Sequence, residues 1–534
     1  MNTLPPELLT LILEKNVDMC RCDKNGVLNL RLVCQAFNKI LRPSIFKTIQ
    51  LEFTRFIQFR DIDGYPDRLE TLQNITSLPS SINLDMTVVR DPDEIDRLKD
   101  AFDSIVTRVP EMADMIESLR NYCLHVDTFT EEDYGRLIRR VFHSGPQITR
   151  LKLSLPFQVV GSASMTTTRL LAHTLACAAN RPEEHLKIDT MVLDHVSDKT
   201  INNIFNVPID VENAFKTFEN LKSLVISFKR QEDEVGMQAI FARNIWLLIR
   251  KAQDLESLCL IGSNVARKKS RRNSNRVDFM EWSMQFPFYY PSTGPVLNNL
   301  RFLELKRLDI DPDLLFILIK ENCRSLTELY LIEVSLKVFG SVDKGNISLW
   351  VGHPNVNPPK REKGIWLAPA LREIEGLNLR ILRVSGLSYD DYDPDPDSVN
   401  PNYDLDDPTG HNQSLEQRFV EAVLGTKAPP TLDTLLSDTS FDIRDINGKA
   451  LDVRNDPDTY DANTYQVNHN TTSIYKRSID GVFYNHTEGA LRELQKIIDV
   501  ADRGMLLISR DIERSQGLTV DHGSGSIIDP SAGI

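Results

Sequence analysis

The stretch "LTELYLIEVSL", residues 326 to 336, shows most clearly how this chain folds. Its leucines are separated first by two residues and then by one, and Val334 and Leu336 continue the series. Apolar residues at alternating positions point to one face of a strand. The preceding "DPDLLFILIKENC" has Asp311 as a capping residue, Pro312 for the first turn and a stripe of leucines, which are signals of a helix. A helix followed by a strand is therefore predicted here.

The same spacing of apolar residues returns along the chain. It is the core of a leucine-rich repeat, in which a short strand lines a concave face. Such triplets also arise by chance in α/β proteins, but seven copies, several of them after a helical segment, favour a curved α/β solenoid. The copies start 26 to 53 residues apart, so the repeats are degenerate or carry inserted loops. They are "ITRLKL" (148–153), "IDTMVL" (188–193), "LKSLVI" (221–226), "LESLCL" (255–260), "LRFLEL" (300–305), "LTELYL" (326–331) and "LRILRV" (379–384).

Two inserted loops are expected, at residues 262–296 and 337–370, within a solenoid that spans residues 52–390. Insertions in a solenoid map to one face, which is often the binding face, and exposed aromatic side chains are favoured anchors for a partner. Folding of these rings back onto the solenoid is the alternative for each of them. The candidate substrate-binding residues are Trp282, Phe288, Tyr289, Tyr290, Trp350 and Trp366.

A basic run, Arg267 to Arg276, lies in the first insertion. It fits a solvated loop, a nuclear localisation signal or a nucleic-acid patch. The net charge of the chain, -14, argues against nucleic acid or an anionic membrane as the main partner. No apolar stretch is long enough to span a membrane, and no secretory signal is recognisable. The seven cysteines are scattered, so we expect a reducing compartment, cytoplasmic or nuclear.

The first 45 residues are expected to form a helical hairpin or three short helices, followed by a strand in "KTIQLEF". Leu8 and Ile12 lie one helical turn apart, and so do Leu9 and Leu13. So short a segment is near the lower size limit for a domain with its own core. Its apolar surface must therefore be covered by the next domain or by a partner.

The segment over residues 1–51 resembles an F-box in "LPPELLTLIL" and "LNLRLVCQAFNKILRPSIFKTIQL". The chain as a whole resembles F-box proteins of filamentous fungi with degenerate leucine-rich repeats. A longer and more polar loop, Val17 to Gly26, departs from the family pattern. The resemblance implies that the helices bind a Skp-type adaptor, and a cullin through it. The residues implied in adaptor binding are Leu4, Pro5, Leu8, Ile12, Leu30, Val33, Cys34 and Phe37, of which we expect Cys34 to be packed.

The expected function is that of a substrate-recognition subunit of a cullin-type ubiquitin ligase, with a protein substrate bound by the repeats. Such a subunit works by proximity, so it needs no catalytic residue. The alternative is a leucine-rich-repeat scaffold that acts outside a ligase, with the helices as a cap of the repeat array. The chain has no phosphate loop, dinucleotide fingerprint, nucleophile elbow or zinc-protease motif, so we expect no enzyme, cofactor or metal site.

The chain changes character after residue 390. Residues 391–480 are rich in Asp, Asn and Pro and predict an acidic loop or a disordered segment. Residues 481–512 include apolar positions at helical spacing and predict a helical cap for the solenoid. Residues 513–534 predict a disordered tail.

Overall fold

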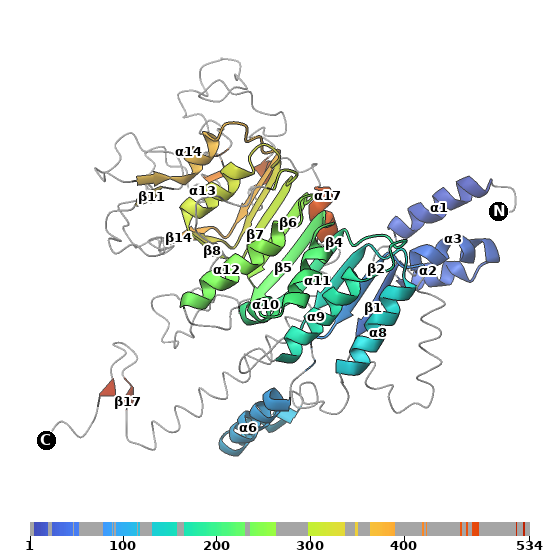
Figure 1. The fold of residues 1–534 in the computed structure, drawn as a ribbon, viewed down its shortest axis with the longest axis horizontal. Coiled ribbons are helices and arrows are strands. Elements are labelled where there is room, and N and C mark those ends of the chain that lie inside the picture. Colours follow the sequence, from blue (N-terminus) through green and yellow to red (C-terminus); the bar gives the residue numbers. More distant parts are fainter. Residues whose placement is uncertain are drawn as a thin grey trace, which may run out of the picture. The chain divides into compact units, whose positions relative to one another are not determined.

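Each copy of the leucine-rich pattern coincides with a β-strand in the computed structural model of the protein (Figure 1). In every copy the strand begins two residues after the first apolar residue. The strands are β3 (Arg150–Ser154), β4 (Thr190–Ser197), β5 (Ser223–Lys229), β6 (Ser257–Gly262), β7 (Phe302–Lys306), β9 (Glu328–Ile332) and β13 (Ile381–Ser385).

Two earlier strands complete one parallel sheet of nine strands. They are β1 (Thr48–Glu52), which confirms the strand expected in "KTIQLEF", and β2 (Ser81–Asp85). The order of the strands in the sheet follows the chain, β1-β2-β3-β4-β5-β6-β7-β9-β13. The predicted α/β class is therefore confirmed.

The structure describes part of the chain. The described residues are 5–19, 24–45, 47–52, 78–87, 89, 92–114, 116–117, 131–156, 165–229, 235–262, 297–336, 348–350, 364–389, 419–420, 423, 460–461, 466–467, 473–479, 519–520 and 527–528. No helix within these ranges is long and apolar enough to cross a membrane.

Helices alternate with the strands. The best predicted of them is α13 (Pro312–Glu321), whose N-cap, Asp311, accepts a hydrogen bond from the Asp313 N–H. The others between sheet strands are α6 (Pro92–Arg108) with the 3-10 helix η1 (Pro110–Met112), α8 (Glu131–Ser144), α9 (Met165–Ala179), α10 (Asp198–Phe205), α11 (Pro208–Phe218), α12 (Val235–Ile249) and α14 (Leu367–Arg372).

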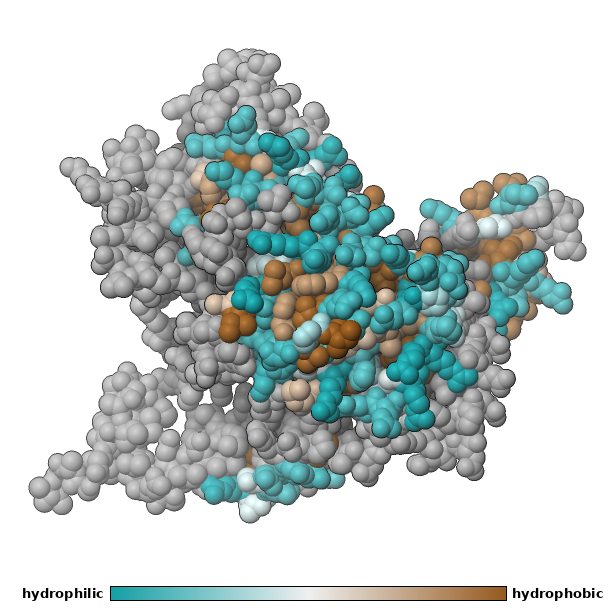
Figure 2. Space-filling model, viewed as in Figure 1, coloured by the Kyte–Doolittle hydropathy of each residue, from teal (hydrophilic) through white to brown (hydrophobic). Residues whose placement is uncertain are grey.

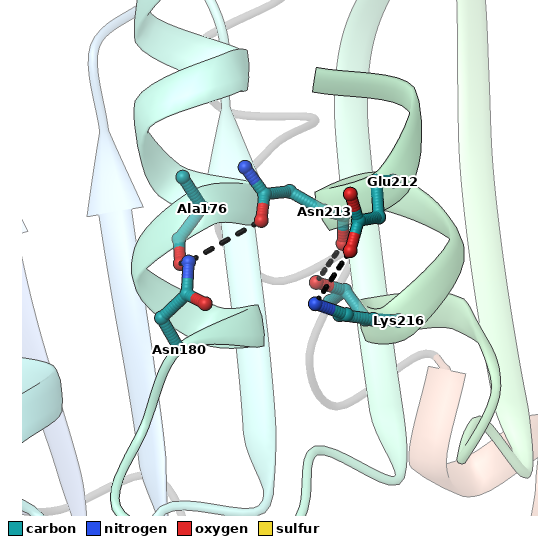
Figure 3. Close-up of polar contacts among 6 residues, drawn as sticks. Ala176, Asn180, Glu212, Asn213 and Lys216 are labelled. Carbon is teal, nitrogen blue, oxygen red and sulfur yellow. Dashed lines mark hydrogen bonds and ion pairs between the residues drawn. The ribbon is translucent and has the colours of Figure 1, made fainter. Parts of the chain in front are cut away.

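The described residues divide into two compact units. The first contains Met1–Asp194 and Val207–Asn220. Its strands place Ile82, Leu151 and Met191 in one register row, and these side chains are buried. Helices α9 and α11 pack against each other. At their contact the Asn180 side-chain amide donates both to the Ala176 carbonyl and, at 3.2 Å, to Asn213 Oδ1 (Figure 3).

The second unit contains His195–Asn206 and most residues from Leu221 onward. Its strands carry two rows of buried apolar side chains in register. The ring of Phe228, which shares this face of the sheet, contacts Phe241 of α12 with 5.5 Å between centroids. The apolar rows therefore face the helices. The rows are Leu224, Leu258, Leu303, Leu329 and Leu382, and Ile226, Leu260, Leu305, Leu331 and Val384.

The last three sheet strands each lead into a second, shorter strand. These are β8 (Asp309–Ile310), β10 (Ser335–Leu336) and β14 (Ser388–Tyr389), and each begins seven residues after the first residue of its sheet strand. They form a parallel sheet in the order β14-β10-β8. Val334 and Leu336, which extend the leucine pattern, are buried as expected.

The structure describes short elements within two of the segments predicted as loop or disorder. The acidic range 391–480 contains a helix, α17 (Ile474–Ile479), a strand pair, β15 (Tyr460–Asp461) with β16 (Gln466–Val467), and buried Phe419 and Val420. The tail 513–534 contains the antiparallel pair β17 (Thr519–Val520) and β18 (Ile527–Ile528), where β-branched residues flank a Gly-Ser-Gly stretch. The helix expected in 481–512 lies outside the described residues.

Candidate functional site

Three short helices open the chain, as predicted, and they have a small core of their own. They are α1 (Pro6–Met19), α2 (Lys24–Arg31) and α3 (Gln35–Ile45). The core consists of buried Leu13, Val27, Phe37 and Leu41, with Leu9, Leu30 and Ile40 packed against it. One buried side chain from each of the first two helices and two from the third therefore hold the unit together.

Helix α1 is apolar on two faces, and only one of them is used by this core. Leu9 and Leu13, four residues apart, pack inward. Leu8, Leu11 and Ile12, at spacings of three and one, remain 48%, 61% and 52% exposed. A helix in water does not keep such a face without a partner unless its own fold covers it. The exposed leucines of α1 are therefore a candidate contact surface.

The connection from α2 to α3 adds three more exposed apolar side chains. Leu28 is 40% exposed on α2, and Leu32 and Val33 are 76% and 63% exposed in the turn that follows. This turn is held by hydrogen bonds from the Leu32 N–H to the Asn29 carbonyl and from the Val33 N–H to the Leu30 carbonyl. The backbone therefore fixes the two most exposed side chains in place.

We call these six residues, Leu8, Leu11, Ile12, Leu28, Leu32 and Val33, the apolar face. Figure 2 shows hydrophobic side chains gathered on the N-terminal helices. In the part of the chain that the structure describes, twelve large apolar side chains are exposed, and these six lie within 26 residues of sequence. Isolated exposed leucines are ordinary, but a concentration of this kind marks an interaction surface.

The structure separates the residues expected to bind an adaptor into two groups. Leu8, Ile12 and Val33 belong to the apolar face. Phe37 is 6% exposed and Leu30 packs beside it, so both support the fold of the helices. Pro5 precedes α1 and its carbonyl accepts a hydrogen bond from the Leu9 N–H. Leu4 lies outside the described residues.

The prediction that Cys34 is packed is wrong, because its side chain is exposed. It lies between Val33 and the first residue of α3, beyond the reach of the small core. Leu11, Leu28 and Leu32 were not among the expected residues. The spacing of three between Leu8 and Leu11 could have indicated the first of them; nothing in the sequence distinguishes the other two from core leucines.

The aromatic residues expected to bind a substrate are only partly described. Trp282, Phe288, Tyr289 and Tyr290 lie outside the described residues. Trp350 ends β11 (Ser348–Trp350) and Trp366 ends β12 (Gly364–Trp366). These strands are parallel and pair Trp350 with Trp366 in register. The structure thus places two of the six candidates at paired positions of neighbouring strands.

A second surface is the face of the sheet in the second unit that lies opposite the apolar rows. We call it the polar face, and it includes Cys259, Glu304 and Tyr330 in one row and Phe302 and Glu328 in the next. Burial is the main cause that raises the pKa of Cys259, Tyr330 and Glu328, and the nearby Glu304 carboxylate raises that of Cys259 further. The polar face therefore holds ionisable groups away from water.

Among the described residues no group of three or more His, Cys, Asp or Glu side chains is placed to hold a metal ion. No protein-family model matches the chain, and no curated protein matches it either. The apolar face and the polar face are therefore the candidate functional surfaces among the described residues.

Proposed function

We propose that this protein is the substrate-recognition subunit of a cullin-type ubiquitin ligase, with its apolar face as the docking site for a Skp-type adaptor. The observation that supports this most is that, in the first three helices, the side chains of the core and the exposed apolar side chains are separate sets. Their core is satisfied by Leu13, Val27, Phe37 and Leu41, so the exposure of the other six apolar residues is not needed for folding. The resemblance of residues 1–51 to an F-box supplies the identity of the partner.

Burial of the apolar face would supply part of the binding free energy. Full burial of one large aliphatic side chain contributes about 1.5–3 kcal/mol, and about half of each of these side chains is already covered. Six such residues would then contribute on the order of 6 kcal/mol before the cost of association is subtracted. Other contacts would have to offset the cost of association and supply the rest of a micromolar affinity, which is about 8 kcal/mol net.

We further propose that the strand–helix units form a curved leucine-rich-repeat solenoid that presents a protein substrate. The parallel order of the strands, their constant offset from the apolar pattern and the repeated short strands support this arrangement. The chain would then act by holding a substrate near the conjugating enzyme, which raises the effective concentration of the substrate lysine.

Co-purification of the full-length chain with a Skp-type adaptor tests the proposal. Leu8→Arg and Val33→Arg place a charge in an interface that would exclude water, so each should abolish capture of the adaptor. Ile209→Arg is the matched control, because Ile209 is an equally exposed apolar residue, at 58%, and belongs to α11 rather than to the first three helices. It should capture as much adaptor as the unmodified chain.

Circular dichroism would verify that the three variants remain folded. If the unmodified chain captures no adaptor, or if Ile209→Arg abolishes capture as thoroughly as Val33→Arg, the proposal is wrong.

A further inference from the structure

Helix α17 lies against the polar face, and it comes from a part of the chain far from the strands that it contacts. The ring of Tyr475 lies 5.9 Å from that of Phe302 in β7, and Lys476 contacts Glu304, 172 residues earlier in the sequence. Since α12 contacts the opposite face through Phe241, the sheet of the second unit has its packing helices on one side and α17 on the other. Figure 1 shows α17 in red beside these strands.

Besides the ring contact with Phe302, polar groups join α17 to the polar face. Lys476 Nζ lies 2.7 Å and 2.8 Å from the two Glu304 carboxylate oxygens, and 5.6 Å from the centre of the Tyr330 ring. The Tyr475 hydroxyl donates to Glu256 Oε2 at 2.8 Å, just before β6 begins. Cation–π contacts and charge-assisted hydrogen bonds of this kind depend on geometry, so they can select a segment by its chemistry.

At the first residues of α17 the exposure pattern is the reverse of that in a helix held by apolar packing. Ile474 is 75% exposed, whereas the side chain of Lys476 is only 14% exposed and its partner Glu304 is fully buried. Helices that belong to a core turn their isoleucines inward and their lysines outward. α17 has six residues, too few to be stable as an isolated helix, so its position depends on its contacts with the polar face.

We propose that the polar face around Glu256, Phe302, Glu304 and Tyr330 is a binding surface for a protein segment that presents an aromatic hydroxyl followed by a lysine. Residues 473–479 occupy this surface as an internal stand-in, and an external partner binds by displacing them. This inference goes beyond the proposed ligase function and does not rest on it.

The internal copy sets the expected strength of binding. A tethered segment competes at an effective concentration on the order of millimolar, so the unmodified chain should bind an external copy only weakly. Replacement of Tyr475 and Lys476 by alanine should make the polar face accessible to an external segment. The buried Glu304 carboxylate would then be available for an external lysine.

The test uses a fluorescent peptide of residues 471–480, TTSIYKRSID, and fluorescence anisotropy with the full-length chain. The double variant Tyr475→Ala/Lys476→Ala should bind the peptide at least tenfold more tightly than the unmodified chain. Adding Glu304→Gln should weaken this binding at least tenfold, and a peptide with alanine in place of the lysine should lose it to a similar degree. Adding Glu333→Gln, at a glutamate whose side chain is 53% exposed, should leave the affinity unchanged.

Equal affinity of the double variant and the unmodified chain, or binding that does not depend on Glu304, would overturn the proposal. Because the double variant could fail to fold, hydrogen exchange of the unmodified chain provides a second criterion. Peptides covering 473–479 should exchange at least tenfold faster than those covering β7, since a displaceable segment opens without the sheet. Exchange as slow as that of β7 would identify α17 as an integral part of the core. Neither measurement needs the adaptor, so its outcome is independent of the co-purification experiment.

Discussion

Arg307 and Glu333 occupy equivalent positions after two neighbouring strands of the sheet, and they contact each other. Both have a left-handed backbone, with φ of 56° and 54°, and Arg307 Nε lies 2.6 Å from Glu333 Oε2. His195 and Gly386 hold the same place, five residues after the first residue of their strands, with φ of 60° and 66°. Four strand–helix units therefore share one backbone conformation that non-glycine residues rarely adopt.

Hydrogen bonds between the ends of neighbouring strands explain why this left-handed conformation is kept. The Arg307 N–H donates to the Ile332 carbonyl, and the Glu333 N–H donates to the Ser385 carbonyl. The ion pair itself contributes little, about 0–1 kcal/mol, because both side chains are partly exposed to solvent. The backbone contacts therefore explain the repeated left-handed residue better than the side chains do.

Gly386→Ala should destabilise the protein by about 1–2 kcal/mol, the usual cost of a left-handed conformation for a residue with a Cβ. The added atom would also lie 3.3 Å from Glu333 Cα, which is a tight contact. Thermal unfolding followed by circular dichroism would measure the loss. Gly135→Ala is the control, because nothing lies within 4 Å of the Cβ position in α8, and it should stabilise by roughly 0.5–1 kcal/mol. A neutral Gly386→Ala would show that the left-handed position is not required.

The repeated strands could be predicted because their signal is local. In each copy the apolar residues lie on the buried face of the strand, and burial of this face is what the spacing reports. The same is true of α13, where Asp311 and Pro312 mark the start within four residues of the leucine stripe. Neither prediction requires knowledge of contacts between distant segments.

The candidate surfaces could be predicted only in part. Helical spacing shows that Leu8 and Leu9 lie on different faces of α1, but not which face the core covers. That choice depends on Phe37 and Leu41 of α3, which occupy the side of Leu9 and Leu13. The contact between Lys476 and Glu304 could not be predicted from the sequence, because two polar residues 172 positions apart form no periodic pattern.

Asn322→Ala should destabilise the protein by about 1–3 kcal/mol, the cost of leaving a buried backbone donor without its acceptor. Asn322 ends α13 and is buried, and its Oδ1 accepts from the Leu297 N–H at 2.7 Å while its Nδ2 donates to the Leu318 carbonyl. Urea denaturation gives the difference. Asn180→Ala removes the amide of an exposed residue, which donates to the Ala176 carbonyl and to Asn213 Oδ1, and should cost less, about 0.5–1 kcal/mol. Equal losses of stability in the two variants would mean that the burial of the Asn322 amide does not increase its contribution to stability.

Glu328→Gln should stabilise the protein more at pH 8 than at pH 4. Burial raises the pKa of Glu328, although the Ser473 hydroxyl and Arg380 both act to lower it. A raised pKa in the folded state means that this group favours folding below the ordinary pKa of glutamate, and that this contribution is lost as the pH rises through the folded pKa. Glutamine has no charge to bury, so the variant avoids the loss. Melting temperatures at the two pH values would show the difference in stabilisation. Glu183→Gln, at an exposed glutamate, is the control for the loss of one charge. A benefit that is larger at pH 4 would contradict the sign.

Phe37→Ala and Val33→Ala should separate folding from docking in the first three helices. Phe37 lies in the small core, and loss of a buried phenylalanine costs about 3–5 kcal/mol, which is enough to open so small a unit. Val33 is 63% exposed, and its truncation should change stability by about 0.5 kcal/mol or less. Hydrogen exchange of α1 and α3 should therefore lose its protection in Phe37→Ala and keep it in Val33→Ala, while adaptor capture weakens in both. If Val33→Ala removed the protection as well, Val33 would be part of the core and would not belong to the apolar face.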